Sequence, residues 1–204
     1  MSSGDSSNTI IDGSGLSDVI IISSNVIDTT TKIIGFGFTN WPNSATGIKL
    51  NQSNPHLSNL SFIGSSQSNG ICVKGTSVRT LIIEHCFFSS ASIGVKLYPS
   101  SNNGSNLISM NKITDCSEGV CVDENSSYGS YGYDVLVSQN IIYSNNIGVK
   151  TLSGNTNIHD NIIVNNNIPL DINGGTCGTG SICGGMSPEL LNNVVAYNTD
   201  GTNL

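Results

Sequence analysis

Charged and aromatic side chains are scarce in this chain of 204 residues, where they make up 10% and 6% of the sequence. So few charges are unusual for a globular surface, and Asn, Ser, Thr and Gly must therefore cover most of it. These residues are poor in helix interiors and suit turns and strand faces. Proline-rich and acidic tracts are almost absent while Ile and Val recur throughout, which argues against disorder.

Basic residues and long apolar runs are also lacking. Seven Lys and Arg residues stand against 14 acidic ones, giving a formal net charge of −7. Nucleic-acid binding depends on cations that neutralise phosphates, so we expect no nucleic-acid partner. No apolar run reaches the length of a membrane span. The first residues lack the basic and apolar parts of a signal peptide, so either the protein is not exported by that route or its leader is missing here.

An internal repeat organises the chain. Six segments share a small residue followed by alternating apolar positions, and their first apolar residues are 23, 24, 25, 29 and 21 positions apart. A second set of apolar residues precedes five of these segments by 11 or 12 positions. The six segments are Gly47-Ile48-Lys49-Leu50, Gly70-Ile71-Cys72-Val73, Gly94-Val95-Lys96-Leu97, Gly119-Val120-Cys121-Val122, Gly148-Val149-Lys150-Thr151 and Pro169-Leu170-Asp171-Ile172, and the second set is Leu60, Ile83, Ile108, Val137 and Ile158.

These alternations are too short for amphipathic helices and suit strands, and one unit cannot bury its inward face alone. The repeat therefore predicts an all-β fold, a single-stranded right-handed parallel β-helix of about six or seven coils in one domain. We expect residues 1–28 to form an N-terminal coil or cap, residues 29–173 the regular coils, and residues 174–204 an irregular last coil or C-terminal cap. A leucine-rich repeat has a similar period, but its consensus is absent.

Asparagines recur in register with the repeat. Asn111, Asn140 and Asn161 each lie nine residues before the first apolar residue of the next segment. Side-chain amides stacked at one tight turn can bond from coil to coil, so we predict an internal asparagine ladder. Cys86 holds the same position one coil earlier, as a small buried group.

Strand alternation sorts the repeated segments into two columns. The predicted inward column is Ile48, Ile71, Val95, Val120, Val149 and Leu170. The predicted outward column is Lys49, Cys72, Lys96, Cys121, Lys150 and Asp171, with neighbours about 4.8 Å apart. Three lysines in line on an acidic protein can attract a polyanion such as a uronate polymer, and a lysine of lowered pKa, Lys96 or Lys150, can act as a base. Alternatively, the lysines only decorate a strand and discourage edge pairing.

The longest segments between strands flank this column. Tyr98 begins one of them, and residues 123–134 account for the longest step of the repeat. Tyrosine rings can stack on sugars, while two adjacent acids can bind Ca²⁺ or serve as acid and base. The alternative is a solvated loop with its tyrosines packed on the coil. The candidate residues are Tyr128, Tyr131, Tyr133, Asp123 and Glu124.

The six cysteines do not fix the compartment. Cys72 and Cys121, two coils apart on the predicted outer column, are too distant for a disulfide. Cys177 and Cys183 flank a glycine-rich loop that can close as a disulfide, or they are two free thiols. The three histidines have no metal-ligand spacing.

Residues 9–13, 19–22, 32–36 and 47–50 resemble the opening of secreted β-helix proteins of the pectin-lyase-like superfamily, and the later coils resemble its generic repeat. The resemblance implies that the lysine-bearing segments are the first strands of the coils, and that the outer face of their sheet holds a polysaccharide groove. It also implies secretion or a cell-surface location, a leader that is absent here, and a longer parent protein. The residue patterns of polygalacturonases and alginate epimerases are missing, so no enzyme family of the group is matched.

Two functions fit these features, and the sequence leaves open whether the protein is an enzyme. The first is an extracellular carbohydrate-interacting β-helix, a possible polysaccharide lyase or epimerase relative that acts on an acidic glycan, with no cofactor or with Ca²⁺ if it is a lyase. Its binding residues would include Lys49, Tyr98 and Asp171. The second is a non-catalytic structural or adhesion solenoid of a cell or particle surface.

Overall fold

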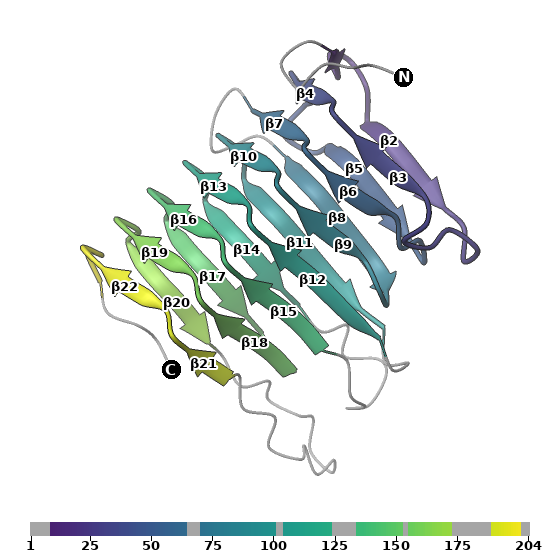
Figure 1. The fold of residues 1–204 in the computed structure, drawn as a ribbon. Helices are drawn as coiled ribbons and strands as arrows, with labels where there is room; N and C mark the ends of the chain where they lie inside the picture. Colours follow the sequence, from purple (N-terminus) through teal and green to yellow (C-terminus); the bar gives the residue numbers. More distant parts are fainter. Residues whose placement is uncertain are drawn as a thin grey trace, which may run out of the picture.

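The computed structural model describes residues 9–64, 70–100, 104–123, 134–152, 155–172 and 189–200. They form a parallel β-solenoid of about six turns (Figure 1), and no described residue is helical. Each strand pairs in parallel with the strand three places further along the chain. The predicted all-β parallel solenoid is therefore confirmed.

Three sheets run the length of the solenoid, and each turn contributes one strand to each sheet. Sheet A contains β1 (Ile10–Asp12), β4 (Gly37–Thr39), β7 (Ser61–Ile63), β10 (Phe87–Ser89), β13 (Lys112–Thr114), β16 (Ile141–Tyr143), β19 (Ile162–Val164) and β22 (Val194–Ala196). Sheet B contains β2 (Asp18–Ser23), β5 (Thr46–Asn51), β8 (Ile71–Val78), β11 (Ile93–Pro99), β14 (Glu118–Val122), β17 (Ile147–Thr151) and β20 (Ile168–Ile172). Sheet C contains β3 (Lys32–Ile34), β6 (His56–Ser58), β9 (Ile82–Glu84), β12 (Ser105–Ser109), β15 (Asp134–Ser138), β18 (Asn155–His159) and β21 (Glu189–Leu191).

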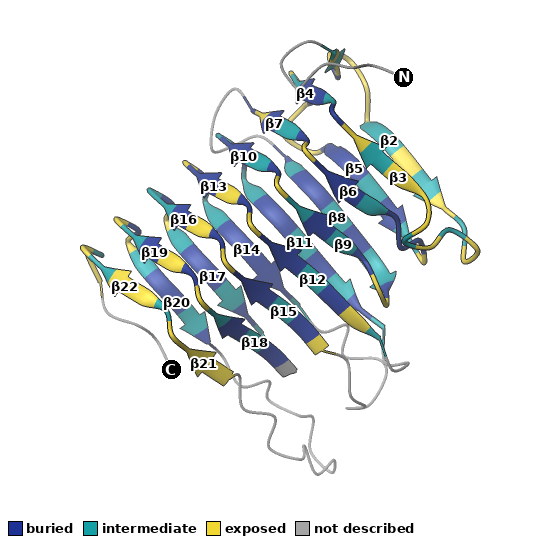
Figure 2. Ribbon diagram, in the orientation of Figure 1, coloured by how far each residue is buried: buried dark blue, intermediate teal, exposed yellow. Residues whose placement is uncertain are grey.

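The core lies between the three sheets, and the middle turns bury it most completely (Figure 2). In sheet B, strand alternation turns one side chain of each strand inward. These inward residues are Ile48, Val73, Val95, Val120, Val149 and Leu170. The position before each inward residue is glycine in four of these strands, because the next coil approaches closely there. A Cβ on Gly119 would lie 2.5 Å from the carbonyl oxygen of Gly148.

The register of one coil differs from the prediction. Val73 pairs with Ile48 and Val95, whereas Ile71 pairs with Thr46 and Ile93. Cys72 therefore occupies the glycine position and is fully buried. The predictions that Ile71 points inward and that Cys72 points outward were wrong. They took Gly70 as the counterpart of Gly47, whereas the residue in that position is Cys72, two residues later.

The second apolar set contained a related error. In sheet C, the residue that pairs with Ile83 is Leu57, so the assignment of Leu60 to that column was wrong. Leu60 instead lies at the turn into sheet A, in the position that Cys86 holds in the next coil. The wrong choice arose because both leucines are apolar and only three residues apart.

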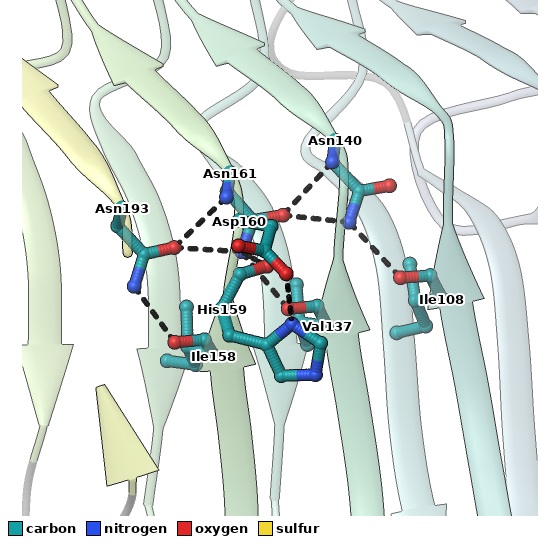
Figure 3. Close-up of polar contacts among 8 residues, drawn as sticks. All are labelled: Ile108, Val137, Asn140, Ile158, His159, Asp160, Asn161 and Asn193. Carbon is teal, nitrogen blue, oxygen red and sulfur yellow. Dashed lines mark hydrogen bonds and ion pairs between the residues drawn. The ribbon is translucent and has the colours of Figure 1, made fainter. Parts of the chain in front are cut away.

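The predicted asparagine ladder is present between sheets C and A, and it is one residue longer than the sequence indicated (Figure 3). Asn140 accepts hydrogen bonds at Oδ1 from the backbone N–H and the Nδ2 of Asn111, at 2.9 and 3.0 Å. Asn161 accepts the same pair from Asn140, and Asn193 accepts it from Asn161. Each Nδ2 also donates to a carbonyl of the preceding coil, as Asn140 does to Ile108 at 2.9 Å.

A second ladder lies at the turn between sheets A and B, and sequence reasoning missed it. Asn145 Oδ1 accepts one hydrogen bond, from the backbone N–H of Cys116. Asn166 Oδ1 accepts from the backbone N–H and the Nδ2 of Asn145, and Asn198 Oδ1 accepts the same pair from Asn166. The missed signal was an Asn five positions after three of the four asparagines of the first ladder, at 140 and 145, 161 and 166, and 193 and 198, whereas Cys116 follows Asn111 at this spacing. Both ladders satisfy buried backbone groups that no strand pairing reaches.

Candidate functional site on the outer face of sheet B

One column of outward residues in sheet B forms what we call the lysine face. It contains Lys49, Lys74, Lys96, Cys121, Lys150 and Asp171 in successive strands β5 to β20. The column therefore holds four lysines, three of them in adjacent strands about 4.8 Å apart. Lys74 was missed because the register error placed Cys72 in its position.

Three lysines of this face pair with carboxylates of the same chain. Lys150 Nζ lies 2.8 Å from Glu118 Oε1, and Lys49 Nζ lies 3.0 Å from Asp18 Oδ2. Each acid lies one coil before the lysine that it contacts. On its own strand, the acid comes three residues before the residue that pairs with that lysine. Exposed ion pairs of this kind are worth about 0–1 kcal/mol, so they hold the side chains in place more than they stabilise the fold.

Lys96 pairs with the predicted site residue Asp123, at 3.7 Å. Asp123 follows β14 directly, and its backbone N–H donates to Leu97 one coil earlier. The predicted partner acid Glu124 and the tyrosines Tyr128, Tyr131 and Tyr133 lie outside the described residues. Asp123, the first residue of the predicted tyrosine-rich loop, is therefore a described residue of this loop that contacts the lysine face.

Tyr98 lies between two lysines of the face. Its ring centroid is 5.1 Å from Lys96 Nζ and 5.6 Å from Lys74 Nζ, within the range of cation–π attraction. Tyr98 comes two residues after Lys96 on β11, so both side chains leave the same face of the strand. Within the described residues, Lys74 makes no ion pair with a carboxylate. Its Nζ lies over the Tyr98 ring instead.

The surroundings of Lys96 and Lys150 favour the charged form of each amine. The hydrogen bond to Glu118 raises the pKa of Lys150 above its usual value, and burial opposes this only in part. For Lys96, burial acts to lower the pKa, but the hydrogen bond with Tyr98 and nearby negative charge, including Asp123, outweigh it and the pKa is raised. A general base would need the opposite shift, so the geometry favours charge neutralisation over proton abstraction.

Cys121 interrupts the positive column. Its side chain is almost fully buried between the lysine-bearing strands, and burial raises its thiol pKa to about 12. The group is therefore neutral at physiological pH, and it separates Lys96 from Lys150. Cys72, Cys86, Cys116 and Cys121 are free thiols. The candidate disulfide between Cys177 and Cys183 lies outside the described residues.

Metal-ligating side chains do not cluster in the described ranges, where no group of three or more His, Cys, Asp or Glu residues could hold an ion. His56 pairs with Glu84 at 2.8 Å on the outer face of sheet C. His159 Nδ1 lies 2.8 Å from Asp160 Oδ2 beside the asparagine ladder (Figure 3). In the same described ranges, no helix is long and apolar enough to cross a membrane.

Comparison of the chain with family models, with curated proteins and with solved structures gave no match. The functional argument therefore depends on the solenoid and on the chemistry of its outer faces. Of these, the lysine face gathers the largest number of the predicted site residues: Lys49, Lys96, Lys150, Asp171, Asp123 and Tyr98.

Proposed function

We propose that this chain is an extracellular, pectin-lyase-like solenoid that binds an acidic polysaccharide lengthwise along the lysine face. The observation that carries this proposal is the alignment of Lys49, Lys74 and Lys96 in three adjacent strands. Parallel strands repeat at about 4.8 Å, so the backbone positions of the three lysines form a regular row along the solenoid axis. A polymer with a carboxylate on each sugar presents charge at regular intervals in the same way.

The polymer would be bound by charge and by stacking together. Tyr98 offers an aromatic surface between two cations, and an aromatic side chain suits the apolar face of a sugar ring. Asp18 and Asp123 already neutralise Lys49 and Lys96 in this row, and Glu118 neutralises Lys150 beyond it, so a polyanion must compete with these acids. We therefore expect modest affinity that falls as salt concentration rises.

The raised pKa values of Lys96 and Lys150 favour binding of the polymer without catalysis. Both Lys96 and Lys150 are shifted toward the protonated state, whereas proton abstraction from a uronate needs a neutral amine. We expect incubation with polygalacturonate or alginate to release no unsaturated uronate products, with or without Ca²⁺. Product release that depends on Lys96 would instead establish a lyase.

The binding test uses polygalacturonate, alginate and the neutral polymer dextran, measured by calorimetry at low and physiological salt. We expect Lys74→Ala to weaken binding of the acidic polymers by about fivefold, since one exposed charged contact is worth about 1 kcal/mol. Lys112→Ala is the matched control, because Lys112 lies in sheet A over the rings of Phe87 and Tyr143. Equal losses for the two variants, or no binding by the parent protein, would contradict the proposal.

A second candidate function is a non-catalytic rod in a cell or particle surface, with no glycan ligand. The observation that favours it is that three of the four lysines are already paired within the chain. The two candidates differ in the binding test, since a rod of this kind should bind none of the polymers at low salt.

A further inference from the structure

An open trough lies on the outside of the turn between sheets C and A, away from sheet B and its lysine face. Its volume is about 630 Å³, and three successive coils supply most of its lining. One wall is formed by turn residues of positive φ, each two positions before a strand residue of the opposite wall. The strand residues of that opposite wall pair in register from β10 to β16. We call this site the turn trough, and its wall residues are His85, Met110 and Gln139 from the turn, and Phe87, Lys112 and Ile141 from the strands.

The turn trough exposes apolar surface in the middle of the solenoid. Met110 is 47% exposed and Ile141 is 44% exposed, although strands β13 and β16 both have a neighbouring strand on each side. Figure 2 shows the exposed residues that begin these two strands. The exposure is therefore a property of the outer surface of the coils. A thioether makes favourable contacts with aromatic rings, so Met110 together with Ile141 suits a flat apolar ligand.

The strand wall of the trough contains a cation that no acid neutralises. Lys112 Nζ lies 5.7 Å from the ring centroid of Phe87 and 5.4 Å from that of Tyr143, which belong to the coils on either side. Among the described residues Lys112 makes no ion pair with a carboxylate, whereas three of the four lysines of the lysine face do. The two rings attract the ammonium group but do not cancel its charge. Lys112 therefore remains able to pair with an anion that enters the trough.

Polar side chains lie at the two ends of the turn wall. His85 comes one coil before Met110 and Gln139 one coil after it, so their backbone positions are two strand spacings apart, about 10 Å. In the described part of the chain, neither side chain forms a hydrogen bond with another residue. An imidazole and a primary amide can each donate and accept hydrogen bonds. The trough thus has polar groups at its ends and apolar groups between them, over the length of one aromatic ring with a short arm.

We propose that the turn trough binds a small aromatic carboxylate of the size of a hydroxycinnamate. The carboxylate pairs with the Lys112 ammonium group and accepts a hydrogen bond from a ring N–H of His85, while the aromatic ring lies over Met110 and Ile141. A hydroxyl on the far side of the ring then reaches the Gln139 amide. A sugar acid fits less well, because hydroxyl groups surround its ring and the apolar centre of the trough would leave them without partners.

The test follows the methyl group of Met110 by nuclear magnetic resonance, in protein labelled at the methyl groups of its three methionines. The variant Met110→Leu assigns the signal. We expect trans-para-hydroxycinnamate to shift this resonance with a saturable, millimolar dependence, because the ring current of the bound ligand acts on the methyl group and an open trough covers only part of the ligand. The neutral amide of the same acid, and galacturonate, which has the carboxylate without the aromatic ring, should each bind more weakly by about fivefold.

Substitution of the cation locates the carboxylate. Lys112→Leu removes the ammonium group and keeps an apolar side chain, so it should weaken hydroxycinnamate binding by about fivefold. Lys112→Arg should retain binding, because a guanidinium group also stacks on aromatic rings and pairs with carboxylates. Lys74→Ala is the matched control, since Lys74 also lies over a tyrosine ring without an ion pair in the described ranges, but on sheet B. It should leave the Met110 titration unchanged while it weakens polymer binding at the lysine face, so the two sites are tested independently.

Lys112 is exposed on the outer face of sheet A, so its substitution should preserve the fold, which circular dichroism checks. If Lys112→Leu does not fold, the comparison of ligands on the parent protein decides alone. The proposal is overturned if hydroxycinnamate leaves the Met110 resonance in place, or if the neutral amide or galacturonate binds as tightly as hydroxycinnamate. Equal losses of hydroxycinnamate binding in Lys74→Ala and Lys112→Leu would overturn it as well.

Discussion

The early and late coils of the solenoid have the same backbone path but different interiors. In sheet A, the inward residues of the early coils are Phe38, Phe62 and Phe88, whose rings stack at centroid distances of 4.6 and 5.2 Å. Trp41 packs against Phe62 in an edge-on arrangement. In the late coils the same inward positions are Ile113, Ile142 and Ile163, and the adjacent turns hold the two asparagine ladders.

The turn itself does not explain this difference. The residue before the ladder position has a positive φ in both regions, for example 52° at Asn59 before Leu60 and 58° at Gln139 before Asn140. A coil can therefore form this left-handed turn with either an apolar or an amide side chain behind it. The comparison indicates that aromatic stacking in the early coils and amide bonding in the late coils are alternative ways to fill the same cross-section.

Removing an aromatic ring should produce the largest effect on stability. Phe62 contacts the rings of Phe38, Phe88 and Trp41, so Phe62→Ala leaves a cavity at the centre of the early coils. We expect a loss of about 3–5 kcal/mol in the free energy of unfolding, from urea titrations followed by circular dichroism.

The fluorescence of Trp41, the single tryptophan, reports on this region. In Phe62→Ala its transition should fall at a lower urea concentration than the transition seen by circular dichroism, because repeat proteins can unfold from their weakest segment. Coincident transitions would show that the aromatic and ladder regions are not separable.

Removing a ladder amide should have a smaller effect, and it should act on the other region. Asn140→Ala leaves the N–H and Nδ2 of Asn111 without their acceptor and the carbonyl of Ile108 without its donor. We expect a loss of about 2–3 kcal/mol, since buried polar groups are left unsatisfied.

The order of the two transitions should reverse in this variant, with circular dichroism changing before Trp41 fluorescence. Asn167→Ala is the matched control, because Asn167 makes only an exposed side-chain hydrogen bond to Asn146 and should cost less than about 0.5 kcal/mol. A comparable loss in the two variants would mean that burial of the amide is unimportant.

The sequence was sufficient to predict the solenoid, because spacing alone determines which residues stack. The first ladder followed from the same spacing at Asn111, Asn140 and Asn161. The errors lay in the coil where the repeat glycine is replaced by Cys72, since no local signal distinguishes Gly70 from the true glycine position. Aromatic stacking was not predicted, because it depends on which Phe points inward where a coil holds two, as at Phe36 and Phe38 and at Phe87 and Phe88.

The candidate site was predictable in position and not in charge state. Strand alternation placed Lys49, Lys96 and Lys150 in one outward column, as the structure has it. Their acid partners Asp18 and Glu118 were missed, because each lies one coil before its lysine and three positions earlier in the strand. Only the three-dimensional pairing shows that Glu118 raises the pKa of Lys150.

Cys86 lies between Leu60, the apolar residue at this turn one coil earlier, and Asn111, the first residue of the first ladder. A substitution at Cys86 should have the smallest effect of the changes that test the difference between the early and late coils. Its Sγ lies 3.2 Å from the carbonyl oxygen of Glu84 and 3.9 Å from that of Leu57, the counterparts of the carbonyls that Asn161 Nδ2 contacts. The backbone N–H of Leu60 also points to this sulfur. An asparagine at this position would find the carbonyl of Leu57 and Oδ1 of Asn111, which are the counterparts of the Ile83 carbonyl and Asn140 Oδ1 that Asn111 contacts.

We therefore expect Cys86→Asn to extend the ladder by one coil and to change the free energy of unfolding by less than about 1 kcal/mol. Cys72→Asn is the matched control, since Cys72 is also a fully buried thiol but lies in the glycine position of sheet B, away from the ladder. There the amide is buried without ladder partners, at a cost of about 2–3 kcal/mol. Equal losses in urea titrations of the two variants would show that amide bonding cannot replace apolar filling at this turn, and that the boundary between the two regions is fixed by more than the residue at position 86.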